Sequence, residues 1–285
     1  MLYPSPRGGM VNNVCKGVIV MTKFFSFIYG CAFFFAVSCV SAYAGEDITI
    51  DLTNSGKGLI SVQYNNKINK PIKVQIENAD KKYVYNVKDN NKNNFPLQMG
   101  IGNYTIMILE NVADNKYRVV KSDTFSVTSV DESKLYLNSI QLVNFNTDMK
   151  AITELNKLTA NAKNTQEKFN IIYDYVTVNL AYDFAKLNNL PSDYIPVIDE
   201  IYLSKKGICY DYASLFASAL RNLGIPTKLQ MGYFTEISDY HAWNQIYLDG
   251  KWINVDTTYD SQYRLNKLDY TIIKDSSQFT VVKQY

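Results

Sequence analysis

The stretch GICYDYASLFASALRNLGIP, residues 207–226, is the segment that best predicts both the fold and the chemistry of this chain. Its apolar residues recur at helical spacing, namely Ala213, Phe216, Ala217 and Leu220. Gly224 stands where a glycine commonly ends a helix, and Pro226 prevents the helix from continuing. These signals predict a helix whose N-terminus lies at or near Cys209.

A cysteine at a helix N-terminus lies in a distinctive electrostatic setting. The unpaired N–H groups and the helix dipole there favour a thiolate, which is the nucleophilic form of the side chain. The backbone N–H of Cys209 would also point outward, where it can stabilise a developing oxyanion. The alternative interpretation is that Cys209 is a small core residue, as lone cysteines often are.

A second informative stretch, HAWNQIYLDGKWINVDTT, covers residues 241–258. Asp249-Gly250 between two β-rich runs predicts a two-residue hairpin turn. With that turn, His241 and Asp256 share one face of the hairpin as diagonal neighbours, with Cα atoms about 7–8 Å apart. Alone, each has an ordinary explanation, a surface histidine and a strand-end cap. Together with Cys209, they have the layout of a Cys-His-Asp nucleophilic triad, in which the aspartate orients the imidazole.

Composition narrows the class of protein. The chain has 285 residues, which suggests about two domains. Apolar residues make up 47% and charged residues 20%, values that exclude a disordered chain or a collagen-like fibre. With 29 Lys and Arg against 27 Asp and Glu, the chain lacks the electrostatic footprint of a nucleic-acid-binding protein. The four cysteines are irregularly spaced and predict neither a zinc ribbon nor a disulfide scaffold.

Residues 1–44 are predicted to be an N-terminal extension and signal peptide. The apolar run FFSFIYGCAFFFAVSCV, residues 24–40, lies between Lys23 and an Ala-Tyr-Ala cleavage site that ends at Ala44. A membrane anchor is the alternative, but the run is shorter than the ~20 residues that a span needs. A lipid anchor at Cys39 is not expected, because no Leu stands three residues before it. We therefore expect a secreted or cell-surface protein, with Met21 as the natural start of the signal.

Residues 45–285 divide into two regions that differ in their pattern of apolar residues. Residues 45–130 contain about seven short strand-like segments separated by Asn/Gly/Asp/Lys clusters, which predicts an immunoglobulin-like β-sandwich domain. The segments are 48–52, 60–64, 72–76, 83–85, 104–108, 117–120 and 124–127. Residues 131–285 are predicted to be α+β. Helices are expected from Asp148, with Ile152, Leu155 and Leu158 inward, and over 165–180, after a capping-box-like Asn164 to Glu167.

The two quoted stretches resemble the transglutaminase-like domain of the papain-fold cysteine enzymes. The order Cys209, His241, Asp256 and the His-Ala-Trp-Asn opening both fit, and Ala181-Tyr182-Asp183 resembles the family's upstream Tyr-Asp segment. The likeness covers roughly residues 134–270. Pro96-Leu97-Gln98 and Gly102-Asn103-Tyr104 are similar to the β-module that precedes this domain in secreted bacterial members. The resemblance implies helices packed on an antiparallel sheet.

The resemblance also implies roles for individual residues. Cys209 would attack a carboxamide carbon, His241 would relay the proton, and Asp256 would hold His241. The Cys209 N–H would supply one oxyanion donor. The second donor would be Tyr182, ahead of the side chains of Trp243 and Gln245. Leu203 stands where papain-type proteases have a glutamine six positions before the cysteine.

Three functions remain open. The leading hypothesis is a secreted, peptidase-like amide hydrolase that acts on a peptide or protein substrate, including a cell-wall or surface protein, through a thioester. The second is a cross-linking transamidase that acts on protein glutamine. The third is a non-catalytic cell-surface binding module with a vestigial site. No metal or other cofactor is expected, since no acidic loop has calcium spacing. Nucleic acid is not expected as a partner, and the membrane only through the signal peptide.

Overall fold

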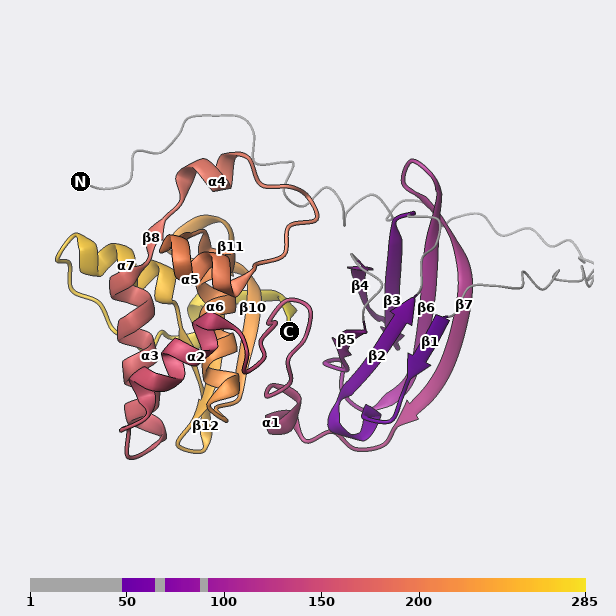
Figure 1. Cartoon of the computed structure of the whole chain (residues 1–285), viewed down its shortest axis with the longest axis horizontal. Coiled ribbons are helices and arrows are strands. Elements are labelled where there is room, and N and C mark those ends of the chain that lie inside the picture. The colour runs from indigo at the N-terminus through magenta and orange to yellow at the C-terminus, as the bar shows by residue number, and fades with distance from the viewer. Residues whose placement is uncertain (1–47, 65–69, 88–91) are drawn as a thin grey trace, which may run out of the picture.

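The computed structural model describes residues 48–64, 70–87 and 92–285, and Figure 1 shows the arrangement of their elements. The predicted signal peptide and lipid-anchor cysteine lie outside these residues. In the described part of the chain, no helix is long and apolar enough to cross a membrane.

In its described residues, the N-terminal region consists of antiparallel strands and one 3₁₀ turn, η1 (Ser55–Lys57). The strands are β1 (Ile48–Asp51), β2 (Leu59–Tyr64), β3 (Ile72–Asn78), β4 (Lys81–Val87), β5 (Asn93–Pro96), β6 (Gly102–Ala113) and β7 (Lys116–Val127). They form two sheets, β1-β2-β5 and β4-β3-β6-β7. The alternation of apolar and polar residues explains this, because Ile72, Val74 and Ile76 are buried while Lys73 and Gln75 are partly exposed. The immunoglobulin type and the domain boundaries stay predictions.

Two details of the strand prediction were wrong. The segments 117–120 and 124–127 belong to one strand, β7, which continues through polar Ser122 and Asp123 because it pairs along the whole of β6. The strand β5 was not predicted. It carries Pro96 and lies at a sheet edge, where a residue without an N–H is tolerated.

The C-terminal region, left of the strand-rich region in Figure 1, combines helices with a sheet. Its helices are α1 (Glu132–Leu135), α2 (Lys150–Thr159), α3 (Thr165–Asn179), α4 (Phe184–Asn188), α5 (Ile198–Ser204), α6 (Cys209–Asn222), α7 (Thr257–Leu265) and the 3₁₀ turn η2 (Ser276–Gln278). The strands β10 (Thr227–Phe234), β11 (Ile237–Leu248), β12 (Lys251–Val255) and β13 (Phe279–Gln284) form an antiparallel sheet of order β12-β11-β10-β13. A short parallel pair joins β8 (Ala181–Tyr182) to β9 (Lys206–Gly207).

One face of the sheet packs against the helices. Ile246, Leu248, Ile253 and Val255 share a core with buried residues of α2, α3, α5 and α6. Helix α3 begins at Asn164, whose side chain accepts from the N–H of Glu167, as the sequence predicts. Leu158 was predicted to point inward, but it is half exposed. Ile152 and Leu155 of α2 already cover the core, so the position of Leu158 faces solvent.

The two regions meet at Tyr285. Its ring packs edge-on against Tyr83, with ring centroids 5.5 Å apart, and also contacts the apolar core of the strand-rich region. Arg221 of α6 is buried and donates to the main-chain oxygens of Thr227, Asn138 and Tyr285. The contacts therefore tie the strand-rich region directly to the helix that begins at Cys209.

Candidate active site

Cys209 is the first residue of α6, as the sequence predicts. The preceding N–H, that of Ile208, donates to the Asp211 carboxylate at 2.9 Å. Gly207 fits closely beneath this turn, because a Cβ at 207 would lie 2.5 Å from the Cβ of Asp211. The thiol is partly exposed and makes no disulfide in the described residues. It lies where the first-turn N–H groups of a 14-residue helix have no partner within the helix.

Asp211 anchors a neighbouring segment beside the thiol. Its side chain is fully buried and pairs with the ammonium of Lys186 at 2.7 Å. The hydroxyl of Tyr194 donates to the same carboxylate, and the Tyr194 ring packs edge-on against Tyr210. The segment between β8 and α5 is thereby held over the N-terminus of α6. This network could not be predicted from the sequence, because Lys186, Tyr194 and Asp211 lie far apart along the chain.

The predicted hairpin forms with the predicted register. Leu248 pairs with Lys251 and Asn244 with Val255, and both Asp249 and Gly250 have positive φ. Such a turn matches the twist of the flanking strands. The chain leaves β12 directly before Asp256, so the turn fixes how far this carboxylate lies from His241.

Asp256 uses its two oxygens for two different purposes. Oδ1 accepts from the N–H groups of Thr258 and Tyr259 and so caps α7. Oδ2 lies 2.6 Å from Nε2 of His241. Both side chains are buried, His241 with 5% of its side chain exposed and Asp256 with none. The aspartate is held rigidly by the helix that it starts, and the imidazole is held by the aspartate.

The thiol of Cys209 and the imidazole of His241 interact electrostatically and through a hydrogen bond. Burial lowers the pKa of His241, but the charge and hydrogen bond of Asp256, with those of Cys209, outweigh it and raise the pKa to about 10. Nε2 faces Asp256, which leaves Nδ1 as the ring nitrogen available to Cys209. The arrangement can move a proton between sulfur and imidazole, which is the chemistry of an activated nucleophile.

The remaining predicted site residues have other partners. The indole N–H of Trp243 donates to Gln230 at 2.9 Å, and the ring stacks beside that of His241 with centroids 6.4 Å apart. The amide of Gln245 donates to Asn254 at 3.1 Å. Trp243 therefore supports His241 through its ring face, and both side chains donate to amide oxygens of neighbouring strands.

Tyr182 lies on β8, which pairs with the short strand β9 just before Cys209. In the β8–β9 pair it stands opposite Gly207, two residues before Cys209. It is partly exposed, and its ring contacts that of Phe184 with centroids 4.9 Å apart. The position fits a residue at the edge of the site. Leu203, at the position of the papain-type glutamine, is largely exposed.

A second buried charge network lies behind Asp256. Asp260, one helical turn further along α7, accepts from the hydroxyl of Tyr173 at 2.8 Å and pairs with Lys274. Burial raises the pKa of Asp260 to about 7, against the opposing effect of Lys274. The spacing of four between the two aspartates is a helix-face signal that could have predicted this residue. The network ties α7 to α3 and fixes the end of the helix that Asp256 caps.

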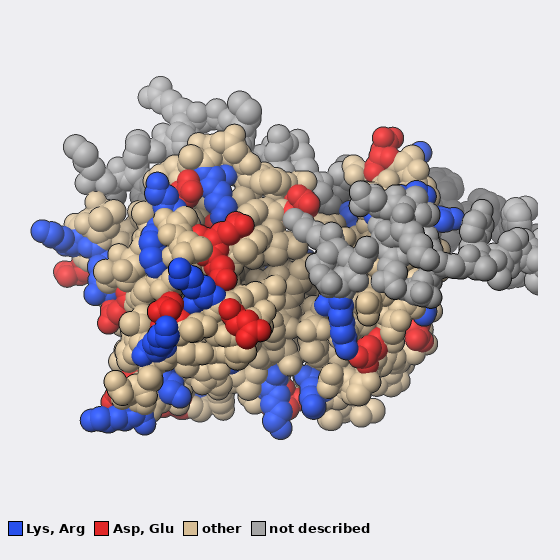
Figure 2. Space-filling model, viewed as in Figure 1, with Lys and Arg blue, Asp and Glu red and all other residues tan. Residues whose placement is uncertain are grey.

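In the described residues, no group of three or more His, Cys, Asp or Glu side chains is placed to hold a metal ion. Figure 2 shows acidic and basic side chains interspersed over the visible face of the C-terminal region.

Comparison with protein families finds a match to the segment that contains this site. Residues 153–257 match the model of the transglutaminase-like superfamily, and the match includes Cys209, His241 and Asp256. The match covers less than half of the chain. The predicted α+β fold with a transglutaminase-like core is confirmed. No curated protein matches the sequence.

Solved structures give weaker likenesses. A candidate cysteine protease from Cytophaga hutchinsonii is 18% identical over 76% of this chain and 74% of its own, with a TM-score of 0.41. A candidate protease from Parabacteroides distasonis is 18% identical over 66% and 38%, with a TM-score of 0.32. Red sea bream transglutaminase is 13% identical over 70% and 48%, with a TM-score of 0.32. The chain spans less than half of the last two proteins, and at these scores the likenesses carry no argument about activity.

Proposed function

We propose that this protein is a secreted cysteine-dependent amide hydrolase, peptidase-like, that cleaves peptide or carboxamide bonds. The observation that carries the proposal is the interaction of Cys209, at the start of α6, with His241, whose Nε2 lies 2.6 Å from buried Asp256. The match of residues 153–257 to the model of the transglutaminase-like superfamily supports the same class of chemistry. Export rests on the signal peptide predicted over residues 1–44.

The reaction follows from the positions of the three side chains. The sulfur of Cys209 attacks the carbonyl carbon while His241 holds the thiol proton. The C–N bond breaks as His241 gives that proton to the leaving amine, and a thioester remains on Cys209. Water then attacks the thioester and loses a proton to His241. The acid product leaves, and the returning proton restores the thiol.

Two groups are proposed to stabilise the oxyanion. The backbone N–H of Cys209 lies in the first turn of α6, where helical N–H groups have no partner within the helix. Tyr182, opposite Gly207 in the β8–β9 pair, is the second donor. Removal of one such donor costs about 10²–10³ in kcat in enzymes of this kind.

The experiment uses p-nitrophenyl acetate as an activated acyl donor, followed by stopped-flow absorbance and intact-protein mass spectrometry. A burst of p-nitrophenol and one acetyl group on Cys209 are expected, both lost in Cys209→Ala and strongly reduced in His241→Ala. An acetylation rate equal to that of a free cysteine would overturn the proposal and favour a non-catalytic binding module.

The same acyl-enzyme separates hydrolysis from transamidation. Release of acetate at a rate unaffected by added cadaverine is expected for a hydrolase. Acetylated cadaverine as the main product would make the protein a transamidase instead, because the amine would then outcompete water for the thioester.

A further inference from the structure

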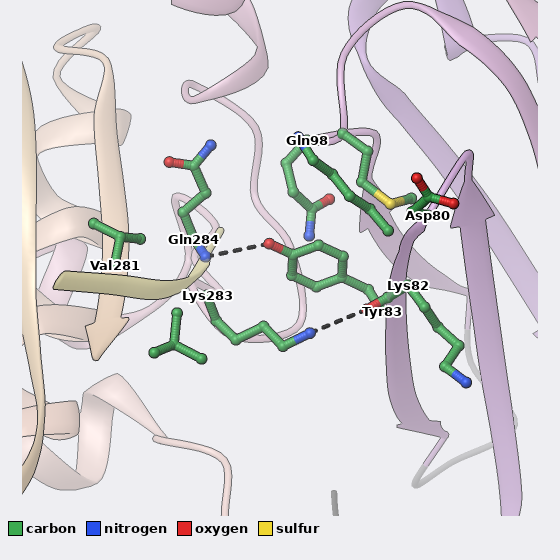
Figure 3. Close-up of a pocket in the computed structure, with 10 residues that line it drawn as sticks. Asp80, Lys82, Tyr83, Gln98, Val281, Lys283 and Gln284 are labelled. Carbon is green, nitrogen blue, oxygen red and sulfur yellow. Dashed lines mark hydrogen bonds between the residues drawn. The ribbon is translucent and has the colours of Figure 1, made fainter. Parts of the chain in front are cut away.

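A cavity of about 490 Å³ lies between the strand-rich region and the C-terminal region, away from the triad. The start of β4, the segment Gln98-Met99 and the end of β13 line it, as Figure 3 shows. None of Cys209, His241 and Asp256 belongs to its lining. The volume is within the range of ligand-binding pockets in proteins.

The lining carries cations without a counter-ion. Lys81, Lys82 and Lys283 line the cavity, and Asp80 is the one acidic residue there. In the part of the chain that the structure describes, none of the three lysines forms an ion pair. Glu77 stands opposite Lys82 on β3, but its carboxylate accepts from Gln75 instead.

Lys283 is the cation most committed to the cavity. Its side chain crosses the cavity, donates to the carbonyl of Lys82 at 3.0 Å and lies 4.2 Å from the ring centroid of Tyr83 (Figure 3). Burial, and then the charge of Lys82, lower the pKa of Lys283. A partly desolvated ammonium beside a like charge is a group that an anionic ligand would stabilise.

Lys81 and Lys82 face different ways on β4. Successive side chains of a strand point to opposite faces, so Lys81 shares the face of Tyr83, whose ring lies in the cavity. The Lys82 side chain leads away from the cavity in Figure 3. Lys81 and Lys283 are therefore the two cations placed to meet a ligand.

Two sheet edges meet at this cavity. β4 ends the order β4-β3-β6-β7, and β13 ends the order β12-β11-β10-β13. The strands are joined across the cavity by the N–H of Gln284 to the Tyr83 hydroxyl, at 3.4 Å, and by Lys283 to Lys82. An open strand edge presents backbone N–H and C=O groups to an added extended chain.

The wall of the cavity also contains a buried polar atom that has no hydrogen-bond partner in the described residues. Gln98 is 8% exposed and donates through Nε2 to the Tyr85 hydroxyl, but its Oε1 has no partner in the described residues. Lysines on edge strands also serve to prevent association between sheets. That role accounts for outward-pointing Lys82, but not for half-buried Lys283 or for a cavity between two edges.

We propose that this cavity binds an extended acidic peptide segment, whose carboxylates pair with Lys81 and Lys283 while its backbone pairs with an open strand edge. The site is separate from Cys209, and the proposal does not depend on the amide-hydrolase function. Failure of either proposal therefore leaves the other standing.

The test uses the Cys209→Ala protein, so that no probe is cleaved, and measures fluorescence anisotropy. The probe is fluorescein-labelled Gly-Glu-Thr-Glu-Thr-Glu-Gly, with the Glu-to-Gln peptide as its neutral match. A second acidic peptide carries N-methyl groups on both Thr amides. The variant is Lys81→Gln with Lys283→Gln, and the charge-matched control is Lys163→Gln with Lys251→Gln, at two exposed lysines outside the cavity. Thermal unfolding establishes that each variant is folded.

The acidic peptide is expected to bind about tenfold or more tightly than the neutral and N-methylated peptides, and about tenfold more weakly to the cavity variant than to the control. Lys81→Arg with Lys283→Arg should restore the binding. Equal affinity for the cavity variant and the control would overturn the proposal. Equal binding of the N-methylated peptide would also overturn the proposal. So would full displacement of the peptide by inorganic phosphate at low millimolar concentration, because the site would then be one for small anions.

Discussion

At the scale of single residues, the site depends on Asp256, because one oxygen starts α7 and the other holds His241. Asparagine keeps a capping oxygen at this position but removes the charge. The substitution therefore separates the two uses of the side chain. The effect of the charge can be read from the pH dependence of stability.

For Asp256→Asn we expect a loss of about 2–4 kcal/mol in the free energy of unfolding near pH 6. The pKa of His241 rises from 6.5 to about 10 on folding, so the stabilisation is complete below pH 6.5 and is lost as the pH rises through about 10. The deficit of the variant should shrink over that window. Urea unfolding at several pH values measures it, with exposed Asp239→Asn as the control. A deficit independent of pH would contradict the assigned pairing.

At the scale of elements, β13 holds the aromatic layer that supports the hairpin. Phe279 of β13 stacks on Phe234, with ring centroids 4.4 Å apart, and contacts Trp243 at 4.8 Å. Trp243 in turn stacks beside His241. The close approach of β10 to β13 at Gly232 allows this layer to form, because a Cβ at that position would lie 1.9 Å from the carbonyl oxygen of Thr280.

Gly232→Ala is therefore expected to lower the free energy of unfolding by about 1–3 kcal/mol, since the backbone of β13 must move away. Gly56→Ala, where a Cβ meets no atom within 4 Å, is the control and should change stability by less than about 0.5 kcal/mol. Chemical denaturation of both variants measures their free energies of unfolding. Equal stability of the two would show that β13 is not held closely against β10.

The sequence predicted those elements whose start, end or turn is marked by residues within or directly beside the element. The Gly224 stop, the Asn164 cap and the Asp249-Gly250 turn each lie within a few residues of what they determine, so α6, α3 and the hairpin followed from the sequence. Leu158 was placed wrongly because periodicity cannot tell which of several apolar positions the core has room for. Asp211 and Gln230 were missed because their partners come from distant segments.

At the scale of the whole molecule, Arg221 links the strand-rich region to the C-terminal region. It lies in the interior and donates to three main-chain oxygens, and burial lowers its pKa to about 9. The guanidinium stays charged at neutral pH and satisfies main-chain oxygens from the linker, β10 and Tyr285. Since Tyr285 also packs on Tyr83, this one side chain joins α6 to the strand-rich region.

Arg221→Met should lower the free energy of unfolding by about 3–5 kcal/mol, because it leaves three main-chain oxygens in the interior without this donor. Arg264→Met removes a mostly exposed pair with Asp174 and should cost about 1 kcal/mol or less. Calorimetric melting of both proteins compares them. A similar small loss for each would mean that Arg221 does not join the two regions.

The central claim is the thiol–imidazole pair, and the most direct test is the alkylation rate of Cys209 by iodoacetamide as a function of pH. Residues 45–285 hold no other cysteine, so the signal has one source. The account predicts fast alkylation at neutral pH that falls about tenfold or more in His241→Ala, because the imidazolium then no longer stabilises the thiolate. A rate profile identical in the two proteins and equal to that of free cysteine would contradict the account.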